Sequence, residues 1–66
     1  MRDFKVIITD DSDRDNLIAE IWYDNKVIAE INSEKSKLEI EFINVNGLLL
    51  DLDGFLEAIN IAKSKL

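Results

Sequence analysis

The chain has 66 residues, a formal net charge of −6, and neither cysteine nor histidine. A chain of this length forms at most one domain, and the missing residue types exclude disulfides, zinc centres and Cys/His catalysis. The acidic balance disfavours binding to nucleic-acid phosphates and favours basic partners.

The first predicted strand covers residues 4–9, which are rich in β-branched side chains. Residues 10–16 follow as a charged segment without an apolar side chain, which predicts a loop. Its alternating aspartates match the opening of a calcium-binding loop, but the glycine and the closing glutamate of that pattern are missing. We therefore expect no metal site at these aspartates, which are Asp11, Asp13 and Asp15.

A hairpin is predicted from residues 17–23 and 27–31, which share the sequence Ile-Ala-Glu-Ile. A three-residue loop ending at Lys26 separates apolar from acidic side chains, whereas a two-residue loop mixes them. We expect the three-residue loop for this reason. One face then carries Ala19, Ile21, Tyr23, Val27, Ala29 and Ile31, and the other carries Ile18, Glu20, Trp22, Ile28 and Glu30.

A fourth strand is predicted over residues 37–43, after a polar turn at residues 33–36. A four-residue loop pairs Asn32 with Lys37, which places alternate apolar residues on the same face as those of the hairpin. These residues are Leu38, Ile40 and Phe42, and Glu39 and Glu41 lie on the opposite face. The three leucines at residues 48–50 are expected to form a short fifth strand or an extended lead-in.

The C-terminal segment is predicted to be a helix, because apolar residues recur at the helical spacing. Asp51 or Asp53 is expected to cap its start, and two lysines near its end suit the helix dipole. The apolar stripe consists of Leu52, Phe55, Leu56, Ile59, Ala62 and Leu66. The sequence thus predicts one α+β domain over residues 1–66: an antiparallel meander of four or five strands with one C-terminal helix on one sheet face.

The other sheet face is the candidate functional surface. In the expected register Glu20 lies opposite Glu30, and Glu30 opposite Glu39. Directly opposed like charges destabilise a sheet, so such a row suggests an acidic surface for a basic partner. Trp22 shares the face, and tryptophan is enriched at interface hot spots. The predicted partner-binding residues are Glu20, Trp22, Ile28, Glu30, Glu39 and Glu41.

Catalysis and cofactor binding find no support in the sequence. Paired carboxylates perform acid–base chemistry only in a pocket that shifts a pKa, and a domain of this size predicts no such cleft. There is no glycine-rich phosphate loop, and the serines lack a candidate base. We therefore expect a non-enzymatic protein without cofactors, which acts in the cytoplasm and does not bind membranes.

Two functions remain open from the sequence. In size, charge and lack of catalytic residues, the chain is similar to small acidic inhibitors carried by phages and mobile elements, which block host nucleases or defence systems. It is also similar to small immunity proteins that neutralise toxins. This likeness implies an inhibitor that occludes a basic protein partner. The alternative is a structural homo-oligomer, most simply a dimer, because a short chain has a small core.

Overall fold

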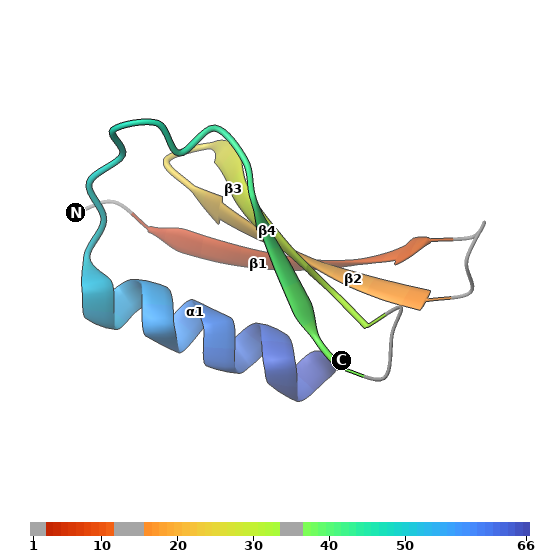
Figure 1. The fold of residues 1–66 in the computed structure, drawn as a ribbon. Helices are drawn as coiled ribbons and strands as arrows, with labels where there is room; N and C mark the ends of the chain where they lie inside the picture. The colour runs from red at the N-terminus through yellow and green to blue at the C-terminus, as the bar shows by residue number, and fades with distance from the viewer. Residues whose placement is uncertain (1–2, 12–15, 34–36) are drawn as a thin grey trace.

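The predicted α+β architecture is confirmed by a computed structural model, which describes residues 3–11, 16–33 and 37–66 (Figure 1). Four antiparallel strands lie in the order β1-β2-β3-β4 and are followed by one helix. Their bounds are β1 Phe4–Asp11, β2 Asn16–Tyr23, β3 Lys26–Asn32, β4 Glu39–Phe42 and α1 Leu52–Lys65. The charged loop is shorter than expected, because β1 and β2 extend into it. Residues 48–50 lead into α1 and form no strand.

The hairpin between β2 and β3 differs from the prediction at its turn. Asp24 and Asn25 form a two-residue turn, and both have positive φ angles, 54° and 66°. This geometry matches the right-handed twist of the flanking strands. Tyr23 therefore pairs with Lys26, and one extra residue, Ile28, is inserted between two ladder pairs as a β-bulge. Beyond the bulge the expected register returns.

The bulge changes which side chains of β3 enter the core. Ile28 is only 1% exposed and belongs to the same buried cluster as its neighbour Ala29. Two successive residues of β3 therefore face the core, which regular strand alternation does not allow. Val27 lies instead opposite Trp22. The predictions that Ile28 lies exposed beside Trp22 and that Val27 is a core residue are both wrong.

The pairing of β3 with β4 is shifted by two residues from the prediction. Asn32 pairs with Glu39 rather than Lys37, and Ile31 pairs with Ile40. An even shift keeps every side chain on its expected face, because strand side chains alternate with a period of two. Only the cross-strand partners change.

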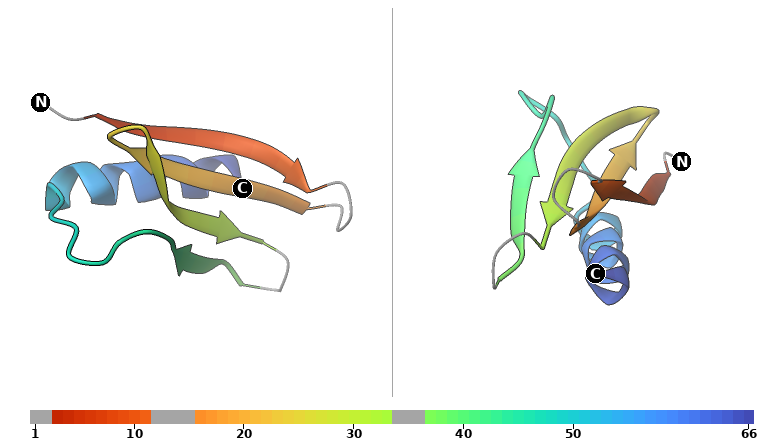
Figure 2. Two further views of the ribbon diagram at one scale, coloured as in Figure 1. Left: turned by 90° about the horizontal axis from the view of Figure 1, so that it is seen from above. Right: turned by 90° about the vertical axis from the view of Figure 1, so that its right-hand side faces the viewer.

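The helix α1 begins at the N-cap Asp51, whose Oδ2 accepts a 2.7 Å hydrogen bond from the backbone N–H of Gly54. The helix packs on β1 and β2 and leaves β4 largely uncovered (Figure 2). Its buried residues are two alanines, Ala58 and Ala62, so the helix approaches the sheet closely. The described residues include no helix with the length and hydropathy needed to cross a bilayer.

The predicted apolar stripe of α1 is wrong at two of its six residues, whereas the other four are buried in the core or pack against it. Leu52 and Leu56 are 67% and 50% exposed, although both belong to that stripe. Phe55, Ile59 and Leu66 pack against the core from one flank of the helix. Part of the apolar surface of α1 therefore remains exposed after the helix packs on the sheet.

Gly54 leads to a testable prediction about this packing. A Cβ atom at Gly54 would lie 2.9 Å from Cε2 of Phe4 and 2.8 Å from Oδ2 of Asp51. The Phe4 ring is held by Tyr23 and Phe55, with ring centroids 4.7 and 6.2 Å away. We expect Gly54→Ala to lower the free energy of unfolding by about 1–2 kcal/mol, despite the better helix propensity of alanine.

Urea denaturation measures this change, with Asn60→Ala on the exposed side of α1 as the control. The control should be neutral or slightly stabilising, because only helix propensity changes there. Stabilisation by Gly54→Ala would show that the close approach of Phe4 does not constrain the start of the helix.

Candidate functional site

The acidic row consists of Glu20, Glu30 and Glu41, which lie side by side on three successive strands. Glu20 pairs with Glu30, and Glu30 pairs with Glu41. Neighbouring strands are about 4.8 Å apart, so the row places three carboxylates on one line across the sheet. The prediction that Glu39 lies opposite Glu30 is wrong, since Glu39 pairs with Asn32. Glu39 nevertheless shares the face, two residues from Glu41.

This row lies on the open face, by which we mean the side of the sheet opposite α1. Ala19 and Ile21, which flank Glu20 in sequence, are fully buried on the sheet face that α1 covers. Strand alternation therefore directs Glu20 and Trp22 to the opposite side. Trp22 is partly buried, and it is not among the hydrophobic residues that pack against the core.

Trp22 is joined to the acidic row by a hydrogen bond. Its indole N–H donates to Oε1 of Glu20 at 3.2 Å. This bond fixes the indole beside one end of the row, with Lys5 and Val27 as its cross-strand neighbours. The open face therefore combines an oriented aromatic side chain with three aligned carboxylates. Ile28, which was expected beside Trp22, is in the core instead and makes no part of this surface.

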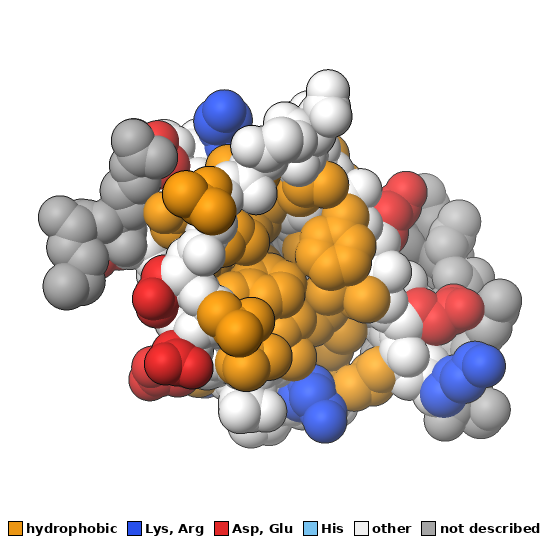
Figure 3. All heavy atoms as spheres, turned by 60° about the vertical axis from the view of Figure 1, so that its left-hand side comes forward, with side chains coloured by type: hydrophobic (Ala, Val, Ile, Leu, Met, Phe, Trp, Pro, Cys, Tyr) orange, Lys and Arg blue, Asp and Glu red, His pale blue; other side chains and the backbone are white. Residues whose placement is uncertain are grey.

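A second surface, which sequence reasoning assigned to the core, lies on the helix side of β4. Leu38, Ile40 and Phe42 are 40%, 41% and 53% exposed there. Figure 3 shows hydrophobic side chains gathered across the middle of this side of the molecule, with charged groups around the margin. We call these three residues the apolar strip. It is exposed because α1 covers β1 and β2 rather than β4.

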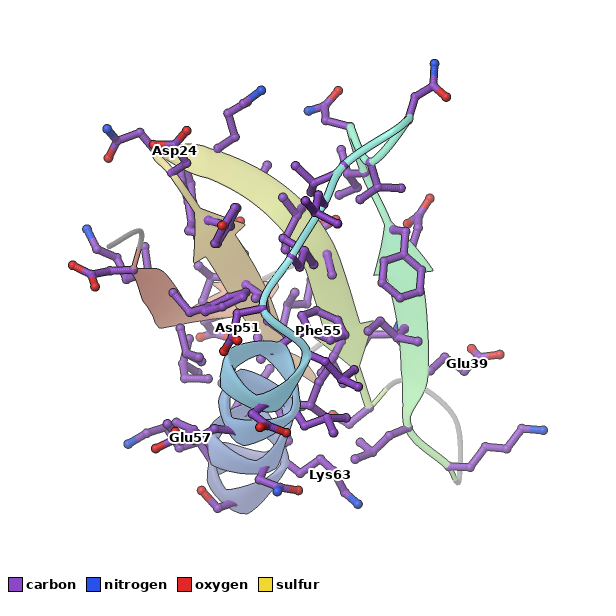
Figure 4. The ribbon with its side chains drawn as sticks, turned by 90° about the vertical axis from the view of Figure 1, so that its left-hand side faces the viewer. Asp24, Glu39, Asp51, Phe55, Glu57 and Lys63 are labelled. Atoms are coloured by element: carbon purple, nitrogen blue, oxygen red, sulfur yellow. The ribbon has the colours of Figure 1, made fainter. Side chains whose placement is uncertain are left out.

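One aromatic contact reaches the apolar strip from the helix. The rings of Phe42 and Phe55 lie with their centroids 6.1 Å apart. Figure 4 shows Phe55 on the flank of α1 that faces β4, whereas Glu39 points outward from the far side of β4. The pattern of alternation predicted which face these residues occupy. The pattern does not indicate how much of that face the helix covers.

A shallow depression of about 740 Å³ lies on the other flank of α1, against β1. Phe4, Val6 and Tyr23 form part of its wall, and Ile61, 41% exposed, lies at its edge. Its carboxylates belong to Asp3, Asp51, Asp53 and Glu57.

Within the part of the chain that the structure describes, no cluster of side chains could hold a metal ion. The calcium-loop pattern of the sequence falls mainly on residues 12–15, which lie outside the described residues. The acidic row and Trp22 do not line the depression beside α1, and the open face presents carboxylates and one oriented aromatic side chain. No protein-family model matches the chain, and comparison with curated proteins and with solved structures gives no significant match.

Proposed function

We propose that this chain is a non-enzymatic binding protein that occludes a basic surface of a partner protein. The observation that carries the proposal is the acidic row in direct cross-strand register, with Trp22 hydrogen-bonded at one end. Opposed carboxylates destabilise the sheet, and a basic partner would convert this repulsion into attraction. The net charge of −6 would also accelerate encounter with such a partner.

The roles within the proposed interface follow from the placement of each residue. Glu20, Glu30 and Glu41 supply charge complementarity, and Glu39 adds charge at the same end of the sheet. Trp22 supplies the apolar anchor, since large aromatic side chains contribute most at interface centres. Nucleases and other nucleic-acid-binding proteins carry the basic surface that this arrangement would recognise, so the proposed role is that of a cytoplasmic inhibitor of such a protein.

The experiment is a capture assay with immobilised protein and a host lysate. Wild-type protein is expected to retain a basic protein, and Trp22→Ala and Glu30→Lys are expected to lose it while keeping the wild-type fold. Retention of the same protein by both variants would place the binding surface elsewhere.

A structural homo-oligomer is the second candidate, and the exposed hydrophobic side chains favour it. Small monomeric proteins rarely expose large contiguous apolar patches. The apolar strip and the exposed leucines of α1 would be buried in such an assembly. Sedimentation equilibrium distinguishes this candidate, because a strict monomer at high micromolar concentration removes it.

A further inference from the structure

The outer edge of β4 is a free sheet edge within the described part of the chain. Beyond β4 no further strand follows in the sheet order. The backbone N–H of Ile43 donates to the carbonyl of Ile28 in β3 at 2.8 Å. Alternate residues direct their N–H groups to the same side of a strand, so Glu41 also bonds toward β3. The N–H groups of Ile40 and Phe42 therefore point outward.

The two sides of this edge differ sharply in chemistry. The helix side carries the apolar strip, and the open face carries the last carboxylate of the acidic row, Glu41. A strand added along β4 would place its own residues alternately on these two sides. Apolar side chains would then cover Ile40 and Phe42, and side chains of the other parity would meet Glu41. Charge complementarity requires these second side chains to be basic.

A second copy of the chain fits this edge poorly. Antiparallel pairing of β4 with β4 of another copy would match the outward-pointing residues, Ile40 and Phe42, with their counterparts. Glu41 would then lie opposite Glu41 or Glu39 of that copy, which repels. Charged residues on edge strands commonly prevent self-pairing in this way. At the other edge of the sheet, β1 presents Lys5 on the open face, which disfavours a basic strand.

We propose that the outer edge of β4 binds an extended segment of a partner protein in which apolar and basic residues alternate. Such a segment adds a fifth strand to the sheet. Its apolar side chains cover the apolar strip, and a basic side chain lies opposite Glu41, at the end of the acidic row. This inference rests on the proposed function in one respect only, namely that the partner is basic. It adds the position at which the partner binds, the outer edge of β4, and the extended conformation of the bound segment.

The test uses the full chain and a synthetic blocked peptide in which lysine and valine alternate. We expect the peptide to slow amide hydrogen exchange at Ile40 and Phe42 by about tenfold or more at saturation, because their N–H groups enter a ladder. Amides in the middle of α1 should be unaffected. A peptide of the same sequence with N-methylated alternate residues should give no protection, and a glutamate–valine peptide should not bind.

The matched variants are Glu41→Lys and Glu57→Lys, which change the net charge equally. Glu57 lies on α1, on the flank away from β4 (Figure 4). Glu41→Lys is expected to weaken peptide binding by about tenfold, and Glu57→Lys to weaken it by less than about twofold.

Two results would overturn this inference. One is peptide binding without protection of Ile40 and Phe42. The other is protection of these two amides in the free protein at high concentration, which would show that a second copy occupies the edge. Neither result affects the capture assay with Trp22→Ala, so a failure of the edge proposal can be told apart from a failure of the proposed function.

Discussion

Replacing Ile28 with alanine is expected to lower the free energy of unfolding by about 2–5 kcal/mol, which is a large share of the stability of so small a domain. Ile28 is one of the two largest fully buried side chains, the other being Ile21. The β-bulge holds it in the core beside Ala29, so truncation leaves a cavity that the paired strands cannot close. Urea denaturation followed by circular dichroism measures the change.

The matched control is Ile40→Ala, which removes the same atoms from the next strand. Ile40 is 41% exposed, so its truncation should cost less than about 1 kcal/mol. Similar losses from the two variants would contradict the bulge, because regular alternation would place Ile28 on the open face, where its truncation costs little.

The second large effect concerns capture of a partner. Trp22→Ala is expected to weaken capture by about 30-fold or more, as is typical when a tryptophan that anchors an interface is removed. Glu30→Lys should abolish capture by a different route, because it places a positive charge in the middle of the acidic row. A binding titration of the captured protein against each variant, at equal concentrations of folded protein, measures both effects.

Two controls separate the open face from the rest of the surface. Glu57→Lys makes the same change of net charge as Glu30→Lys, and Ile61→Ala truncates an exposed apolar side chain on α1. Both should bind as the wild type does. If these controls lose binding while Trp22→Ala retains it, the partner docks on the helix flank beside β1, and the open face is not the interface.

Strand alternation and helical spacing were sufficient to predict the architecture from the sequence. They placed four strands and the C-terminal helix correctly, and they identified Asp51 as one of two possible caps. They also assigned Glu20, Trp22 and Glu30 to one face. These inferences depend on the side-chain periods of two in strands and 3.6 in helices. Small errors in the predicted loop lengths do not change these periods.

The wrong predictions concern features that do not change the alternation of side chains along a strand. A two-residue turn followed by a bulge gives the same distant register as a three-residue loop, so the sequence could not separate them near Ile28. A shift of two residues preserves every face, which hid the exchange of Glu39 for Glu41 in the row. The extent to which α1 covers the sheet depends on the close approach of Ala58 and Ala62, for which alternation gives no signal.

The central claim is that the open face keeps three aligned carboxylates at a cost to the stability of the fold. Glu30 is the most informative position, because it has an acidic neighbour on each side, Glu20 and Glu41. The most direct test is the free energy of unfolding of Glu30→Lys relative to wild type at low ionic strength, with Glu57→Lys as the control for net charge. We predict that Glu30→Lys is more stable than wild type by about 1 kcal/mol, and that added salt reduces the difference. Equal or lower stability would contradict the claim, because the acidic row would then carry no energetic penalty that partner binding has to explain.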